Sequence, residues 1–116
     1  MPRLAGLDRD LHIGDILRLP ENYDLGPGSA PVDLLVCETN DDGLGLIVVS
    51  GYKAGLVYAI LPGASKAGES RVIAHGWLME NWDKWFCYGY QDGMRTIPME
   101  SAVILAWDQR DLRDLT

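Results

Sequence analysis

The sequence predicts an α+β fold in which a curved, mainly antiparallel sheet or a partly open barrel carries one short amphipathic helix. Two observations favour the antiparallel sheet: about six strand-like runs, and two Asp-Gly pairs that each separate two such runs and are typical of hairpins. A third observation is that one segment has helical periodicity, which does not fit the regular βαβα alternation of a parallel sheet. The length of 116 residues predicts a single domain over residues 1–116.

The N-terminal third begins with a predicted strand and a loop. Residues 11–19 alternate loosely between apolar and polar side chains and stop at Pro20, which indicates one early strand. Residues 21–31 hold glycines and prolines and few large apolar groups. We therefore expect a surface loop there, long enough to be functional.

The middle of the chain predicts a hairpin followed by a third strand. Residues 32–39 and 44–49 are mostly apolar and flank the turn Asn40-Asp41-Asp42-Gly43, so we expect them to pair. The glycines of residues 51–55 predict a tight connection to a further buried strand at residues 56–61.

The segment 77–86 predicts the helix. Apolar side chains recur on one face at helical spacing, and charged side chains lie away from it; the first are Leu78, Trp82, Trp85 and Phe86, the second Glu80, Asp83 and Lys84. Gly76 suits the N-cap and Gly89 the stop of this helix.

Shorter elements surround the helix. Residues 63–70 are rich in small side chains and predict a loop, and residues 71–74 a short strand. Residues 87–90 and 96–107 look strand-like and are separated by the second Asp-Gly turn. The charged tail from residue 108 onward predicts a frayed helical turn or an exposed end.

The acidic composition limits the partners. Seventeen acidic and ten basic residues give a net charge of −7, and only Lys53, Lys66 and Lys84 are lysines. Binding to a nucleic-acid backbone requires clustered lysine and arginine, so we expect no direct contact with nucleic acid. A negative field speeds encounter with a basic protein surface, although the same charge also serves solubility alone.

Apolar runs are too short for a membrane span. A span requires about 20 consecutive apolar residues, whereas residues 44–62 are interrupted by Gly45, Ser50 and Lys53. Asp8 and Asp10 stand where a signal peptide would be apolar. We therefore expect a cytoplasmic protein that does not bind membranes.

The usual catalytic and metal-binding sets are missing from the sequence. His12 alternates with apolar neighbours and His75 precedes the helix, while Cys37 and Cys87 fit small buried hydrophobes better than thiolates. The GYKAG sequence of residues 51–55 lacks the Gly-Lys-Ser/Thr ending of a phosphate loop. We therefore expect no metal and no cofactor.

Two carboxylate pairs remain as candidates for chemistry. Asp41 and Asp42 occupy a predicted turn, where aspartate is favoured for its backbone geometry. Glu80 and Asp83 share a helix face at the spacing of a metal or glycoside-hydrolase pair, but a solvated helix face is the commoner outcome. An enzyme is therefore the third choice among the function classes.

Aromatic residues are concentrated in the second half of the chain. Trp82 and Trp85 are expected in the core, whereas Trp77 and Tyr52 are less constrained. Tryptophan, tyrosine and arginine dominate interface hot spots. Aromatic side chains beside acidic ones suit a surface that docks a basic partner.

Two motifs carry a resemblance to a known family. The run from Gly51 to Leu56, GYKAGL, and the run from Trp77 to Trp85, WLMENWDKW, resemble a GYKAG-like loop and a WLxENWxKW-like helix. These are features of the small cytoplasmic immunity proteins encoded beside bacterial polymorphic toxins. The resemblance covers residues 44–90.

The resemblance implies an antitoxin used in bacterial competition: a protein without catalysis that binds a cognate toxin domain and blocks its active site or substrate access. An acidic inhibitor can fill the basic cleft of a toxin that acts on nucleic acid. From exposure and chemistry, the expected contact residues are Glu38, Asp41, Asp42, Tyr52, Lys53, Trp77, Glu80 and Asp83.

The alternative is an adaptor or regulatory module that binds a peptide or a small molecule. Residues 14–20, GDILRLP, resemble the first strand of SH3-like barrels, and aromatic side chains line the grooves of such modules. This alternative predicts a partly open SH3-like barrel.

Overall fold

The computed structural model describes residues 3–21, 31–39, 43–51, 53–68, 71–89 and 93–105. Its main feature is a five-stranded sheet with the order β5-β4-β3-β2-β9, in which all neighbours are antiparallel. The strands of this sheet are β2 (Ile16–Leu19), β3 (Val32–Glu38), β4 (Leu44–Val48), β5 (Val57–Ile60) and β9 (Val103–Leu105). The α+β class with a mainly antiparallel sheet is confirmed, and in the described residues the sheet does not close into a barrel.

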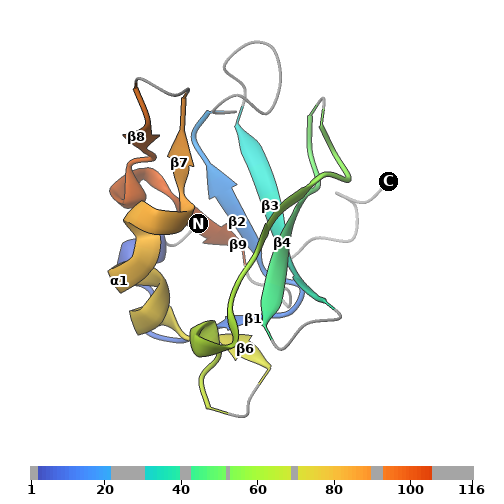
Figure 1. Ribbon diagram of the computed structural model, residues 1–116, viewed down its shortest axis with the longest axis vertical. Coiled ribbons are helices and arrows are strands. Elements are labelled where there is room, and N and C mark those ends of the chain that lie inside the picture. Colours follow the sequence, from blue (N-terminus) through green and yellow to red (C-terminus); the bar gives the residue numbers. More distant parts are fainter. Residues whose placement is uncertain are drawn as a thin grey trace.

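Two short strand pairs and one helix complete the described elements. The pairs are β1 (Leu11–His12) with β6 (Val72–Ile73) and β7 (Cys87–Tyr88) with β8 (Arg95–Thr96), and the helix is α1 (His75–Trp85). Three 3-10 turns, η1 (Leu4–Gly6), η2 (Gly63–Ser65) and η3 (Met99–Ser101), connect them. Figure 1 shows α1, β7 and β8 together on one side of the sheet and the β1–β6 pair at one end.

The β3–β4 hairpin is the part of the fold that the sequence predicts best. Its register runs from Leu34 opposite Val48 to Glu38 opposite Leu44. Alternate residues of β3 are buried, which is the period-2 pattern of a strand with one face on the core. The connecting turn falls on residues 40–42, outside the described residues.

The predicted strand over residues 11–19 is wrong, because the chain turns in its middle. Gly14 has φ of 97°, a left-handed conformation that glycine adopts without a steric penalty. The turn sends β1 to pair with β6 and β2 to pair with β3 and β9. The predicted strand over 96–107 is also divided, because Pro98 has no N–H to donate and the 3-10 turn η3 follows it.

The strand predicted as buried at residues 56–61 lies instead at the edge of the sheet. The side chains of Leu56, Val57 and Ile60 are 47%, 51% and 46% exposed. Leu61, directly after β5, is buried. Because β4 is the sheet neighbour of β5, only one edge of this strand is paired within the five-stranded sheet.

The helix α1 attaches to the core through the face that the sequence predicts. Leu78 and Trp82 are buried, as is Phe86 directly after the helix, and they join the sheet residues in one cluster. The predicted caps are wrong: Ala74 is the N-cap, Gly76 lies inside the helix, and the helix ends before Gly89. The amide of His75 donates to the carboxylate of Asp10 at 2.9 Å, so a residue distant in sequence caps the helix.

Candidate functional site

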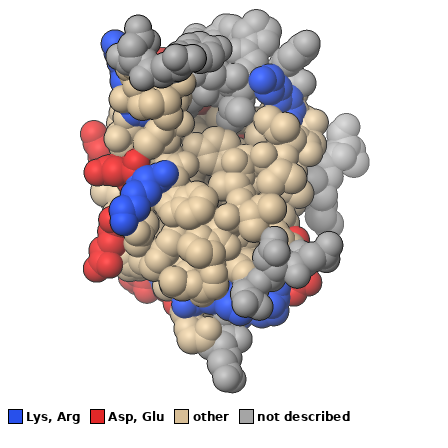
Figure 2. All heavy atoms as spheres, viewed as in Figure 1, with Lys and Arg blue, Asp and Glu red and all other residues tan. Residues whose placement is uncertain are grey.

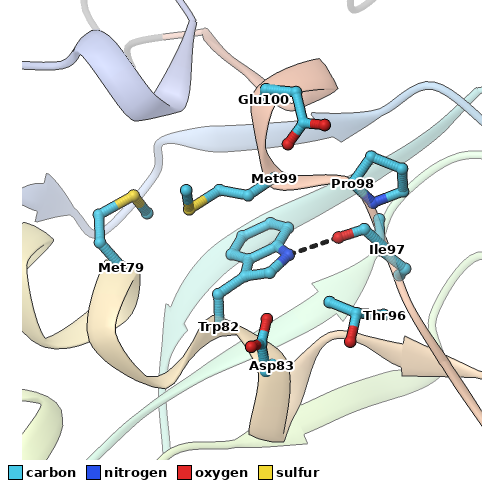
Figure 3. Close-up of a pocket in the computed structure, with 8 residues that line it drawn as sticks. All are labelled: Met79, Trp82, Asp83, Thr96, Ile97, Pro98, Met99 and Glu100. Atoms are coloured by element: carbon cyan, nitrogen blue, oxygen red, sulfur yellow. Dashed lines mark hydrogen bonds between the residues drawn. The ribbon is translucent and has the colours of Figure 1, made fainter.

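A cavity of about 500 Å³ lies between α1 and residues 96–100, and we call it the α1 groove. Its lining comes from the helix on one side and from β8, η3 and the residues between them on the other. The lining residues are Met79, Trp82, Asp83, Thr96, Ile97, Pro98, Met99 and Glu100 (Figure 3).

The base of the α1 groove is rigid. The indole N–H of Trp82 donates to the backbone oxygen of Ile97 at 2.6 Å, which ties the helix to the opposite wall. The Trp82 ring stacks on Phe86 with centroids 3.8 Å apart. The amide of Ile97 donates in turn to the oxygen of Phe86 at 2.8 Å. Because three contacts link the same residues, the two walls are held in one geometry.

The walls of the groove combine polar and apolar surface, and the apolar part is adaptable. Met79 from α1 and Met99 from η3 extend toward one another beside Trp82 (Figure 3). Methionine has an unbranched, polarizable side chain that adjusts to different neighbours. Pro98 adds a further apolar surface. The walls can therefore accommodate an aliphatic group of variable position.

Two carboxylates border the groove. Asp83 and Glu100 are both exposed, and they lie on opposite sides of the Trp82 ring (Figure 3). Within the described residues, neither forms an ion pair with a lysine, arginine or histidine. Figure 2 shows acidic side chains, with a basic side chain among them, on the side of the molecule where α1 lies, next to a broad uncharged area. Asp83 and Glu100 therefore add negative charge to a groove whose walls are partly apolar and partly polar.

Comparison with known proteins assigns the chain to a family. The model of the family described as Immunity protein 45 matches residues 8–93. The chain belongs to this family of immunity proteins. No curated protein and no solved structure matches it. The predicted membership in an immunity family is confirmed, and with it a general role in toxin immunity.

The matched region of this immunity protein contains one wall of the α1 groove. Met79, Trp82 and Asp83 lie within residues 8–93, whereas the opposite wall at residues 96–100 lies beyond the match. The groove is therefore built partly from the family region and partly from residues after it.

The structure places the predicted contact residues of the immunity protein on two separate surfaces. Trp77, Glu80 and Asp83 lie on α1, where Trp77 is half-buried with its ring centroid 6.3 Å from that of Trp85. Glu38 ends β3 and forms an ion pair with Arg71. Asp41, Asp42 and Tyr52 fall outside the described residues.

The second surface lies beside the edge strand β5. A cavity of about 280 Å³ there has a mostly apolar lining that includes Glu38, Ile47, Val57 and Ile60. Lys53 is exposed in the connection between β4 and β5. The lining residues of this cavity and of the α1 groove do not overlap.

Sequence reasoning missed the wall of the α1 groove formed by residues 96–100. It treated these residues as part of a strand, although Pro98 is a signal against a regular strand. Trp82 gave a second signal. It was expected in the core, and the indole N–H of a buried tryptophan usually has a hydrogen-bond acceptor. Neither signal indicates which carbonyl accepts the bond.

The titratable groups in the described residues are explained by local packing. The ring nitrogen Nε2 of His75 lies 2.7 Å from the oxygen of Leu4, and Nδ1 of His12 lies 3.1 Å from Arg9. Burial raises the pKa of the Cys37 thiol. Among the described residues, no group of three or more His, Cys, Asp or Glu side chains could hold a metal ion. In the same part of the chain, no helix has the length and apolarity to cross a membrane.

Proposed function

We propose that this chain is a cytoplasmic immunity protein that binds a cognate bacterial toxin domain and blocks its active site or its substrate access. Membership in the Immunity protein 45 family supports the role, and the α1 groove supports a binding mode. The observation that carries the binding mode is the pair of carboxylates of Asp83 and Glu100, which form no ion pair within the described residues and lie beside the apolar side chains of the groove.

The proposed contact surface is centred on α1. Asp83 lines the groove, and Glu80 is exposed on the same helix. Trp77 is half-buried and contributes aromatic area beside these charges. The turn residues Asp41 and Asp42, together with Glu38, Tyr52 and Lys53, remain candidates for a second part of the contact.

The proposed action is inhibition by binding, without catalysis, cofactor or metal. An inhibitor of this kind requires a rigid surface that is complementary in charge and shape to its target. The net charge of −7 matches a basic toxin surface and accelerates the encounter. We further propose that residues 1–116 act as one immunity domain.

Co-expression tests this proposal. The chain is produced together with the C-terminal domain of the protein encoded immediately upstream, and growth rescue and co-purification are measured. Rescue together with a stable complex supports the proposal. Toxicity without rescue, or a harmless upstream domain, contradicts it and favours a peptide-binding adaptor.

Charge reversal tests where the toxin domain binds, with the dissociation constant of the purified complex as the readout. The double variant Glu80→Lys/Asp83→Lys is expected to weaken the complex at least about tenfold, because each change places a cation opposite a basic surface. Asp8→Lys/Glu21→Lys is the matched control, since it makes the same change in net charge at two exposed residues that do not line the groove. If the α1 variant and the control weaken the complex equally, α1 is not part of the contact surface.

A further inference from the structure

We propose that the α1 groove is a pocket for one arginine side chain supplied by the protein partner. This inference rests on the proposed function, since it names the chemical group that the toxin presents to the groove. It also makes a claim about the groove that can be tested without the toxin.

The volume and the walls of the groove suit a long side chain with an apolar stem. A cavity of about 500 Å³ lies within the range of about 300–1,000 Å³ found for pockets that bind small molecules. Met79, Pro98 and Met99 offer apolar contacts. The methylenes of arginine pack on such surfaces while the charged end reaches polar groups.

The two carboxylates at the groove are suited to bind the charged end of an arginine side chain. Asp83 comes from α1 and Glu100 from η3, so the negative charge is presented from two elements. No lysine or arginine is among the lining residues. A guanidinium has five N–H donors in a planar arrangement, which allows it to form two parallel hydrogen bonds with one carboxylate while the other adds negative charge at the same groove.

Two basic residues are neighbours in sequence of residues that line the groove, but they do not pair with its carboxylates. Lys84 follows Asp83 on the helix and Arg95 precedes Thr96, and both are exposed. Neither is within ion-pair distance of Asp83 or Glu100. The Arg3 guanidinium binds the backbone oxygen of Glu100 at 2.6 Å, but within the described residues neither carboxylate has a salt-bridge partner, so a cation from a partner can pair with them.

The cavity beside β5 does not share this chemistry. Its one carboxylate, Glu38, is already paired with Arg71, and the rest of its lining is mostly apolar. An arginine entering there would have to displace an existing ion pair. The observations thus favour the α1 groove over the second cavity as the arginine pocket.

The first arm of the test measures affinity for the upstream toxin domain by calorimetry. Asp83→Asn/Glu100→Gln removes the two carboxylates, and Asp8→Asn/Glu21→Gln is a control that removes two charges outside the groove. Thr96→Trp fills the groove at an exposed position without changing the charge. We expect the first and third variants to lose at least about tenfold in affinity and the control to stay within about twofold.

The second arm uses a small probe. N-acetylarginine amide is titrated into the free protein, and the resonance of the Trp82 indole N–H, which is bonded to Ile97 across the groove, reports occupancy. We expect saturable shifts that are absent with N-acetylnorleucine amide and absent in the Asp83→Asn/Glu100→Gln variant.

The outcomes separate the two proposals. Toxin binding that is unchanged in both groove variants overturns the arginine pocket and leaves the immunity function intact. A toxin domain that does not bind, with an indole resonance that responds to the arginine probe, overturns the proposed function and supports the pocket. No response in either arm overturns both.

Discussion

Substituting Trp82 with phenylalanine tests how the walls of the α1 groove are held together. The substitution keeps an aromatic ring that can still stack on Phe86, but it removes the indole N–H. The backbone oxygen of Ile97 then loses the donor that lies 2.6 Å away. The variant therefore isolates the link between α1 and residues 96–100.

The expected loss of stability has two parts. A buried acceptor without a partner costs about 1–3 kcal/mol, and the lower half applies because the groove can admit water. The smaller ring leaves about 40 Å³ unfilled, which costs about 1 kcal/mol at about 24 cal/mol per Å³. The free energy of unfolding should fall by about 2–3 kcal/mol, or about 10 °C in Tm.

Urea unfolding followed by far-ultraviolet circular dichroism measures this loss. Trp77→Phe is the matched control, because it deletes the same atoms from a half-buried ring for which no indole hydrogen bond is seen. The control should lose less than about 1 kcal/mol. Equal losses in the two variants would refute the claim that the indole bond secures the groove.

Three further predictions concern the rest of the fold. Gly43→Ala should destabilise by more than about 2 kcal/mol, since the new Cβ would lie 1.8 Å from the backbone oxygen of Leu61; Gly6→Ala, with nothing within 4 Å, should be nearly neutral in thermal unfolding. Asp15→Asn should cost about 1–3 kcal/mol, because the fully buried carboxylate accepts an arginine N–H at 2.8 Å; an unfolding midpoint equal to that of the wild type would contradict this. Burial raises the pKa of Tyr58 to about 12. The pKa of tyrosine in an unfolded chain is about 10. The contribution of the Tyr58 phenol to the free energy of unfolding should therefore be complete below that pH and be lost as the pH rises to about 12. Denaturant midpoints for Tyr58→Phe that fall as steeply over this range as those of the wild type would contradict it.

The elements that the sequence predicted correctly are those determined by residues close together in the chain. The β3–β4 hairpin is local: its two runs lie on either side of one turn, and the pattern of burial follows from alternation. The face of α1 is equally local. The N-cap is not, because the helix begins where the carboxylate of Asp10 accepts the amide of His75, 65 positions along the chain.

The candidate site shows the same limit. Asp83 and Glu80 were identified because a helix presents its charged face to solvent, a property of a short segment. The opposite wall was missed because Thr96 and Glu100 acquire their role only when the segment that contains them lies beside the helix, where Ile97 accepts the indole N–H of Trp82. A sequence pattern gives the face of a helix, but it does not state which distant backbone covers it.

The attachment of the N-terminal segment to residues near the last strand bears on when the protein becomes active. Arg3 donates to the oxygen of Glu100 over a separation of 97 positions, and the amide of Leu4 donates to Ala102. A ribosome adds about 5–20 residues per second, so the first residues wait about 5–20 s for their partners. The groove wall at residues 96–100 is synthesised after α1, so the groove lacks this wall during part of the same interval. A molecule that is still being synthesised therefore cannot present the complete α1 groove to a partner.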